Sequence, residues 1–102
     1  MIYCDLSLNG VYIWTGRPCL NGVYLRVQTY YGPIGGDLMF MDTQGSSNPT
    51  WDGLGARYQL VWFPDSSTPA SNVPLQAVPA QQLDVLLGSI TYTLCIYENS
   101  PS

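Results

Sequence analysis

Two stretches of the chain alternate apolar and polar residues with a period of two. In residues 57–63 one side carries Tyr58, Leu60 and Trp62. Residues 89–97 hold the clearest alternation, with one face made by Ile90, Tyr92, Leu94 and Ile96. Because successive side chains of a strand point to opposite faces, this period predicts two β-strands, each with one face toward a core.

The dipeptide Asn-Gly occurs twice between apolar residues, at positions 9–10 and 21–22. Both residue types tolerate the positive φ that a type I′ hairpin turn requires. We therefore predict a hairpin from residues 3–8 and 11–15, and a second turn with a strand within residues 20–27.

A third pattern is shorter and lies in the middle of the chain. Residues 37–42 place Leu38 and Phe40 on one face and Met39 and Met41 on the other, which predicts a short strand. With the turns around it, the chain is typical of an all-β fold. We expect a small β-sandwich or barrel of about six to eight short antiparallel strands, with at most one short helix.

Turn-forming and polar residues fill the segments between these strands. Residues 43–55 predict a long polar loop, and residues 64–79, rich in Ser and Pro, predict an extended arm that lies across this chain or against a neighbouring subunit. Ala80–Leu87 is compatible with one or two helical turns. We expect a β domain over residues 1–63, the arm over residues 64–79, and residues 80–102 as a C-terminal strand that completes the fold or joins a neighbour.

Charged residues are scarce in this chain of 102 residues. They make up 10%, whereas hydrophobic residues make up 46% and the net charge is −4. Lys and His are absent, and the cations are Arg17, Arg26 and Arg57. Three scattered Arg cannot form the basic patch that nucleic acid or an anionic membrane requires, so we expect neither as a partner. So little charge favours a surface that is partly covered in an assembly.

The N-terminal residues and the cysteines both indicate a reducing, cytoplasmic environment. Residues 1–5 lack the basic region of a signal peptide, so we expect synthesis in a cytoplasm. The three cysteines, Cys4, Cys19 and Cys95, are odd in number and widely spaced. This pattern is not a disulfide framework, and we expect three free thiols.

The residues that most enzymes use are missing. Without His there is no Ser-His-Asp or Cys-His arrangement and no imidazole metal ligand. Residues 32–36 are rich in Gly but lack the Lys of a phosphate-binding loop, and Asp42 and Asp52 lack the spacing of a calcium loop. We therefore expect a protein that is not an enzyme, with no catalytic residue, no cofactor and no metal.

Aromatic residues supply the best candidates for contacts with other molecules. Trp14 and Trp62 lie in predicted strands, where core positions are expected, whereas Trp51 lies in the polar loop. We predict an interface that uses Trp51, Tyr30, Tyr31 and Arg17.

Three motifs occur in a fixed order in the first two thirds of the chain. Residues 16–25 read Gly-Arg-Pro-Cys-Leu-Asn-Gly-Val-Tyr-Leu, and residues 34–40 contain Gly-Gly-Asp-Leu. Residues 48–55 read Asn-Pro-Thr-Trp-Asp-Gly-Leu-Gly and are followed by Leu-Val-Trp-Phe at residues 60–63. In order and spacing these motifs resemble a family of small phage baseplate plug proteins, first described for a cyanophage with a contractile tail. The resemblance covers residues 6–63.

This resemblance implies a structural virion protein of a tailed phage, assembled in the host cytoplasm. Such a protein would lie at the tail tip or baseplate hub and would close or line the axial channel, or join tail proteins. Its partners would be other phage tail or baseplate proteins, with a symmetric homo-oligomer about the tail axis. The alternative is a small β-sandwich binding module that contacts a glycan or a host surface through exposed aromatic residues.

Overall fold

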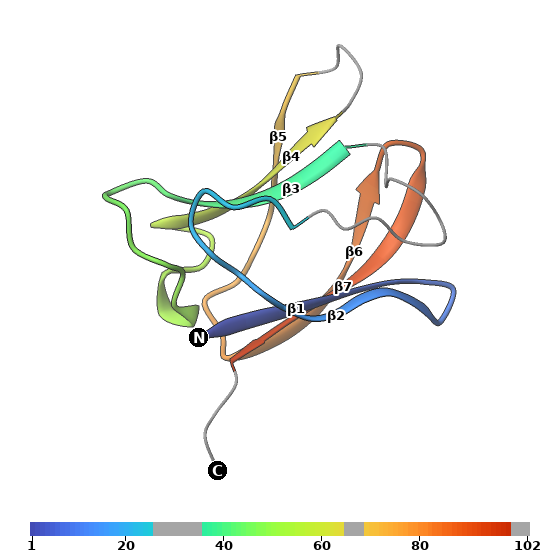
Figure 1. The fold of residues 1–102 in the computed structure, drawn as a ribbon, viewed down its shortest axis with the longest axis horizontal. Helices are drawn as coiled ribbons and strands as arrows, with labels where there is room; N and C mark the ends of the chain where they lie inside the picture. Colours follow the sequence, from blue (N-terminus) through green and yellow to red (C-terminus); the bar gives the residue numbers. More distant parts are fainter. Residues whose placement is uncertain (26–35, 65–68, 99–102) are drawn as a thin grey trace.

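The computed structural model describes residues 1–25, 36–64 and 69–98 (Figure 1). Within them the chain is all-β, with one 3-10 turn, η1 (Trp51–Gly53), and no α-helix. No helix there is long and apolar enough to cross a membrane. The strands are β1 (Ile2–Leu8), β2 (Val11–Pro18), β3 (Gly36–Asp42), β4 (Tyr58–Pro64), β5 (Ser71–Val73), β6 (Ala80–Leu87) and β7 (Ile90–Glu98).

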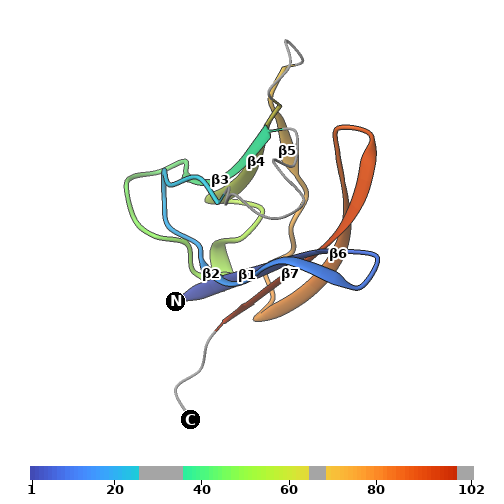
Figure 2. The same ribbon diagram turned by 45° about the vertical axis from the view of Figure 1, so that its right-hand side comes forward.

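The strands form two antiparallel sheets that lie in two layers (Figure 2). One sheet has the order β2-β1-β7-β6, and the other has the order β3-β4-β5. The two sheets do not close into a barrel, so of the two architectures expected, the sandwich is the one that forms. Strand β7 pairs with both β1 and β6, and residues from the two ends of the chain therefore share one sheet.

The core lies between the two sheets and takes every second side chain of the long strands. Leu38 and Phe40 of β3 are buried, as are Leu60 and Trp62 of β4, so the predicted inward faces are confirmed. Trp14 is also buried, as expected for a core position. In β7 the inward face begins at Tyr92, because Ile90 lies at the end of the sheet and stays exposed. Among the residues that the structure describes, the other fully buried side chains are Ile2, Cys4, Leu6, Cys19, Leu25, Leu94 and Ile96.

The first Asn-Gly forms the predicted hairpin. Asn9 and Gly10 both have positive φ, 53° and 81°, as a type I′ turn requires. The strands on either side pair as β1 and β2, with register shifts on both sides of Leu6. Such irregularities bend a strand and increase its twist. Strand β2 continues to Pro18, three residues beyond its predicted end.

The second Asn-Gly makes a turn, but the strand that we expected within residues 20–27 does not form in their described part. Asn21 bridges to Phe40 and Tyr24 bridges to Met39, so this segment lies along β3. The Leu25 N–H donates to the Leu38 carbonyl at 2.8 Å, and the Leu25 side chain is buried. Burial of Leu25 against the core explains why the segment follows β3. Residues 26–27 lie outside the described part.

The helical turns expected at Ala80–Leu87 are wrong, because this segment is strand β6. All eight residues pair with β7 in continuous register. Val85 and Leu87 face the core and Leu83 packs against it, an alternation that only a strand can bury. A two-residue connection, Gly88-Ser89, closes the hairpin. The pairing partner decides the structure here, since Gln81 and Gln82 favour a helix only locally.

The segment expected to form an extended arm contributes to the fold where the structure describes it. Pro64 ends β4, and Ser71–Val73 pairs with β4 as strand β5. Val73 is buried and Leu75 packs against the core. This part of the segment therefore lies on its own chain.

Candidate assembly interface

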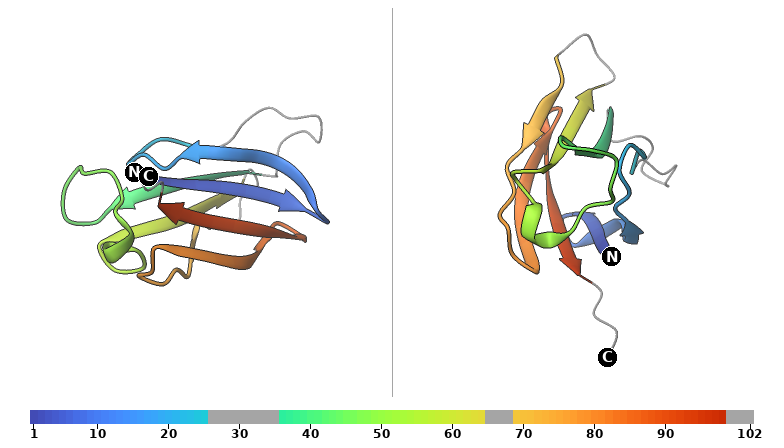
Figure 3. Two further views of the ribbon diagram at one scale, coloured as in Figure 1. Left: turned by 90° about the horizontal axis from the view of Figure 1, so that it is seen from below. Right: turned by 90° about the vertical axis from the view of Figure 1, so that its left-hand side faces the viewer.

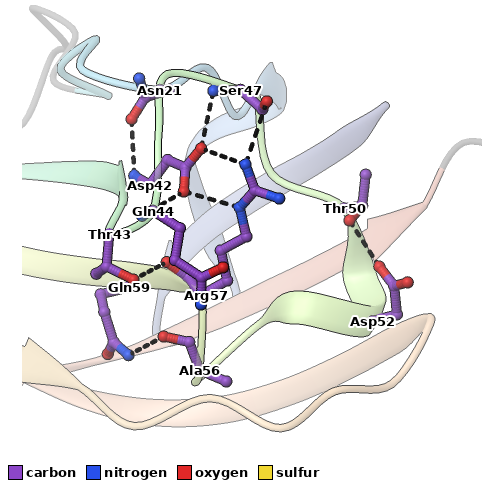
Figure 4. Close-up of polar contacts among 10 residues, drawn as sticks. All are labelled: Asn21, Asp42, Thr43, Gln44, Ser47, Thr50, Asp52, Ala56, Arg57 and Gln59. Carbon is purple, nitrogen blue, oxygen red and sulfur yellow. Dashed lines mark hydrogen bonds and ion pairs between the residues drawn. The ribbon is translucent and has the colours of Figure 1, made fainter.

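A carboxylate and a guanidinium hold the polar loop that carries Trp51 (Figure 4). Asp42, at the end of β3, accepts hydrogen bonds from Nε and Nη2 of Arg57, each at 2.9 Å. It also accepts the backbone N–H groups of Gln44 and Ser47, both at 2.9 Å. We call these four residues the loop clamp. The Asp42 side chain is closed to solvent, while that of Arg57 is 37% exposed.

The electrostatics of the loop clamp keep Asp42 ionised. The hydrogen bonds from Arg57 contribute most and, together with those from the Gln44 and Ser47 backbone, they hold the pKa of Asp42 below its ordinary value. The same pairing raises the pKa of Arg57. The ion pair is a structural link between two neighbouring strands, because Asp42 ends β3 and Arg57 directly precedes β4.

Further hydrogen bonds join the loop to the segment before β3. The Asn21 side-chain oxygen accepts the Asp42 N–H at 2.8 Å, and the Asn48 side-chain oxygen accepts the Asn21 N–H at 3.1 Å. Thr43 Oγ1 donates to the Arg57 carbonyl at 2.7 Å. These bonds connect the loop to parts of the chain that are far apart in sequence. Figure 4 shows those from Asp42 to Asn21 and from Thr43 to Arg57.

Trp51 opens η1 and is half-buried, with part of its side chain packed against the core. Leu54, which lies between Gly53 and Gly55, is 2% exposed. A Cβ at Gly53 would lie 2.7 Å from the Tyr58 ring, so the turn needs a glycine there to approach β4. Part of the Trp51 side chain is therefore exposed, while the rest of it is held against the core.

The other predicted interface residues divide into two groups. Arg17 lies in β2, opposite Cys4, and is half-buried. Within residues 1–25, 36–64 and 69–98, no ion pair or hydrogen bond joins Arg17 to Trp51. Tyr30 and Tyr31 fall outside the described residues. The contact role of all four residues remains a prediction.

The structure reveals an exposed apolar surface that was not predicted from the sequence. Val11 and Tyr12 follow the β1–β2 turn and are 45% and 59% exposed, while Leu86 and Ile90 flank the β6–β7 turn and are 66% and 45% exposed. Ser7 pairs with both Tyr12 and Thr93, so the two hairpin turns lie at the same end of the sheet (Figure 3, left). We call these four residues the hairpin-tip surface; Tyr12 and Leu86 lie on the outer face of the sheet, and Val11 and Ile90 lie on the face toward the other sheet. The available signal was apolar residues within two positions of a turn glycine.

The outer face of the four-stranded sheet carries a second polar link. Asp5 Oδ1 accepts the Tyr97 hydroxyl at 2.9 Å and the Gly16 N–H at 2.7 Å. The Tyr3 and Tyr97 rings stack, with centroids 6.2 Å apart. Burial and the bond to Asp5 raise the pKa of Tyr97 to about 12, so its hydroxyl stays protonated at neutral pH. The group ties β2, β1 and β7 together.

The cysteines are free thiols, as predicted: Cys4 and Cys19 are buried and Cys95 is half-buried. Burial and the nearby Asp5 carboxylate raise the pKa of Cys95. In the part of the chain that the structure describes, no three His, Cys, Asp or Glu residues come together as metal ligands. The arrangement found there consists of structural links and exposed apolar side chains.

The comparison with known families covers the part of the chain that holds these features. A family model described as "Cyanophage baseplate Pam3 plug gp18" matches residues 1–65, which include β1 to β4, the loop clamp and η1. No curated protein and no solved structure matches the chain. The match spans more than half of the 102 residues and confirms the resemblance carried by the three motifs. The chain therefore belongs to the family of cyanophage baseplate plug proteins.

Proposed function

We propose that this chain is a stoichiometric structural part of a phage baseplate, at the tail tip or hub. There it closes or lines the axial channel, or joins neighbouring tail proteins. Family membership over residues 1–65 is the observation that carries the proposal, since a baseplate plug family implies a structural role in the baseplate and a place in the virion. The chain has no turnover activity in this proposal.

The surface of the protein supports a role in assembly. The hairpin-tip surface exposes four large apolar side chains at one end of the molecule. Such side chains gain free energy when a partner removes them from water, at about 25 cal/mol per Å² of apolar area. The chain as a whole carries few charges, since 10% of its residues are charged. This composition suits the core of a protein interface, where charged residues are depleted.

The loop clamp supports the proposed contact role of Trp51. A residue that anchors a partner loses less entropy on binding when its support is already ordered. Asp42 and Arg57 order the loop before any partner binds. Arg17, Tyr30 and Tyr31 complete the proposed contact set, and the proposed assembly is a symmetric homo-oligomer about the tail axis.

The test is to measure incorporation of the chain into phage particles. Quantitative mass spectrometry of purified particles should find the chain at a fixed ratio to other baseplate proteins. Trp51→Ala should lower that ratio, whereas Ser46→Ala, at an exposed position of the same loop, should leave it unchanged. Because Trp51 also packs against the core, Trp51→Ala should lower the unfolding midpoint of the isolated protein without unfolding it.

Two outcomes would count against the proposal. Particles without this chain would remove the virion role, and binding of the isolated protein to glycans would then favour the binding-module alternative. If Trp51→Ala unfolds the isolated domain, Trp51 is a core residue and its assignment to the interface fails.

A further inference from the structure

The two sheets end in four edge strands, and three of these edges are blocked. Strand β2 is irregular, with shifts in register and Gly16 and Pro18 near its end. Strand β5 has three residues. The edge of β3 is covered by residues 21–25, whose N–H groups at Gly22 and Leu25 donate to β3 carbonyls. Such features prevent an edge from pairing with a further strand.

The fourth edge, β6, is long and regular. Its eight residues pair with β7 without a bulge. The strand lies at one side of the larger sheet (Figure 3, left). The Glu98 N–H donates to the Pro79 carbonyl at 2.9 Å, which sets the order of the hydrogen-bonded pairs. Because these pairs alternate along an antiparallel ladder, residues 81, 83, 85 and 87 bond to β7. The backbone groups of Ala80, Gln82, Asp84 and Leu86 point away from it, and no described strand pairs with that side.

A groove of about 150 Å³ lies beside this edge, between β6 and β5. Its apolar lining comes from Trp62 and Val73 of one sheet and from Leu83 and Val85 of the other. A strand added along β6 would direct every second side chain toward this groove. Backbone hydrogen bonds together with a side-chain groove are the requirements for recognition by strand addition.

The charge at this edge indicates which strand can bind. Asp84 lies in the second half of β6. Its side chain is exposed and forms no ion pair with the described residues. A second copy of this chain would bring another Asp84 to the same short ladder and would also carry a net charge of −4. Like charges facing each other across a ladder destabilise it, whereas a cation there stabilises it.

We propose that β6 pairs with an extended strand of another baseplate protein, which places small or apolar side chains in the groove and a Lys or Arg opposite Asp84. This inference rests on the proposed baseplate role. The groove and the outward backbone groups provide affinity, and Asp84 selects the charge of the partner strand.

The decisive measurement is residue-resolved hydrogen exchange of the chain in assembled particles and in isolation. The N–H groups of Gln82, Asp84 and Leu86 should exchange at least about tenfold more slowly in particles, since they gain partners there. The N–H groups of Leu83 and Val85, already bonded to β7, serve as the control within the same strand and should change little.

Paired variants test the direction of the backbone groups and the charge. Gln82→Pro removes an outward N–H and should keep the isolated fold while lowering incorporation into particles. Gln81→Pro removes an N–H that bonds to β7 and should unfold the isolated protein. Asp84→Lys should lower incorporation more than Asp84→Asn does, and neither should change the unfolding midpoint greatly.

The identity of the partner is read from a photoreactive residue, p-benzoylphenylalanine, placed at Leu86. A cross-link to a strand of a different particle protein, with a basic residue near the site, supports the proposal. A cross-link to a second copy of this chain would overturn it. Particles that contain the chain but leave the Gln82, Asp84 and Leu86 amides unprotected would overturn the edge pairing alone, whereas particles without the chain would overturn the baseplate role as well.

Discussion

At the scale of single residues, the side chain of Asp42 makes more hydrogen bonds than a lone turn residue needs. Within the described part of the chain its carboxylate accepts four, two of them from a guanidinium. Bidentate pairing with Arg adds geometric specificity to charge attraction. The antiparallel pairing of Asp42 with Tyr58 places Arg57 within reach. The turn residues after Asp42 predict that its carboxylate binds nearby backbone N–H groups. Its pairing with Arg57 follows only from the register of β3 and β4.

The loop clamp makes stability depend on pH in a defined direction. Because the folded-state pKa of Asp42 is lowered, its contribution is fully present above the unfolded-state pKa of about 3.9 and is lost as the pH falls toward the folded-state value. The urea midpoint of unfolding, measured between neutral pH and pH 3, should decrease once the pH drops below this unfolded-state pKa. Asp42→Asn should lower the midpoint at neutral pH and flatten the acidic decrease. An unchanged acidic slope in this variant would contradict the assignment.

At the scale of elements, neighbours in space decided the structure of two segments. Residues 21–25 follow β3 because Leu25 is buried there, although their Asn-Gly is typical of a hairpin. Residues 80–87 form a strand because β7 offers eight paired positions and a core face for Val85 and Leu87. Local preference is weak compared with such pairing and burial.

The loop after η1 allows a matched test of turn geometry. Gly10 and Gly55 share a φ of 81°, but a Cβ at Gly10 meets open space, whereas one at Gly55 would overlap the Leu75 carbonyl oxygen. Gly10→Ala should therefore lower the free energy of unfolding by about 1–2 kcal/mol, which is the cost of placing a residue with a Cβ in the left-handed conformation. Gly55→Ala should cost distinctly more. Urea unfolding of both variants measures the difference, and equal costs would show that the contact with Leu75 is absent.

At the scale of the whole molecule, the family match and the cooperative fold cover different parts of the chain. The match ends at residue 65, but β7 lies between β1 and β6 in the centre of the larger sheet. Without β7, strand β1 with its buried residues Ile2, Cys4 and Leu6 loses one of its two partner strands and keeps only β2. The matched residues are therefore only part of the folding unit.

A fragment of residues 1–65 should consequently fail to fold on its own. Its circular dichroism should show no cooperative thermal transition, and its amide NMR signals should be poorly dispersed. The full chain, measured under the same conditions, provides the control. A well-dispersed spectrum of the fragment would mean that the first four strands have a core of their own.

The sequence alone determined the fold class, the first hairpin, the inward faces of β3, β4 and β7, the core positions of Trp14 and Trp62, and the family. These features depend on a period of two, a turn dipeptide and short motifs, all of which act over a few neighbouring residues. Tertiary structure decided the strand at residues 80–87, the course of residues 21–25, the loop clamp, the hairpin-tip surface and the edge of β6 with which no described strand pairs. Each of these depends on which strands become neighbours, and that choice is made by burial of side chains that are distant in sequence.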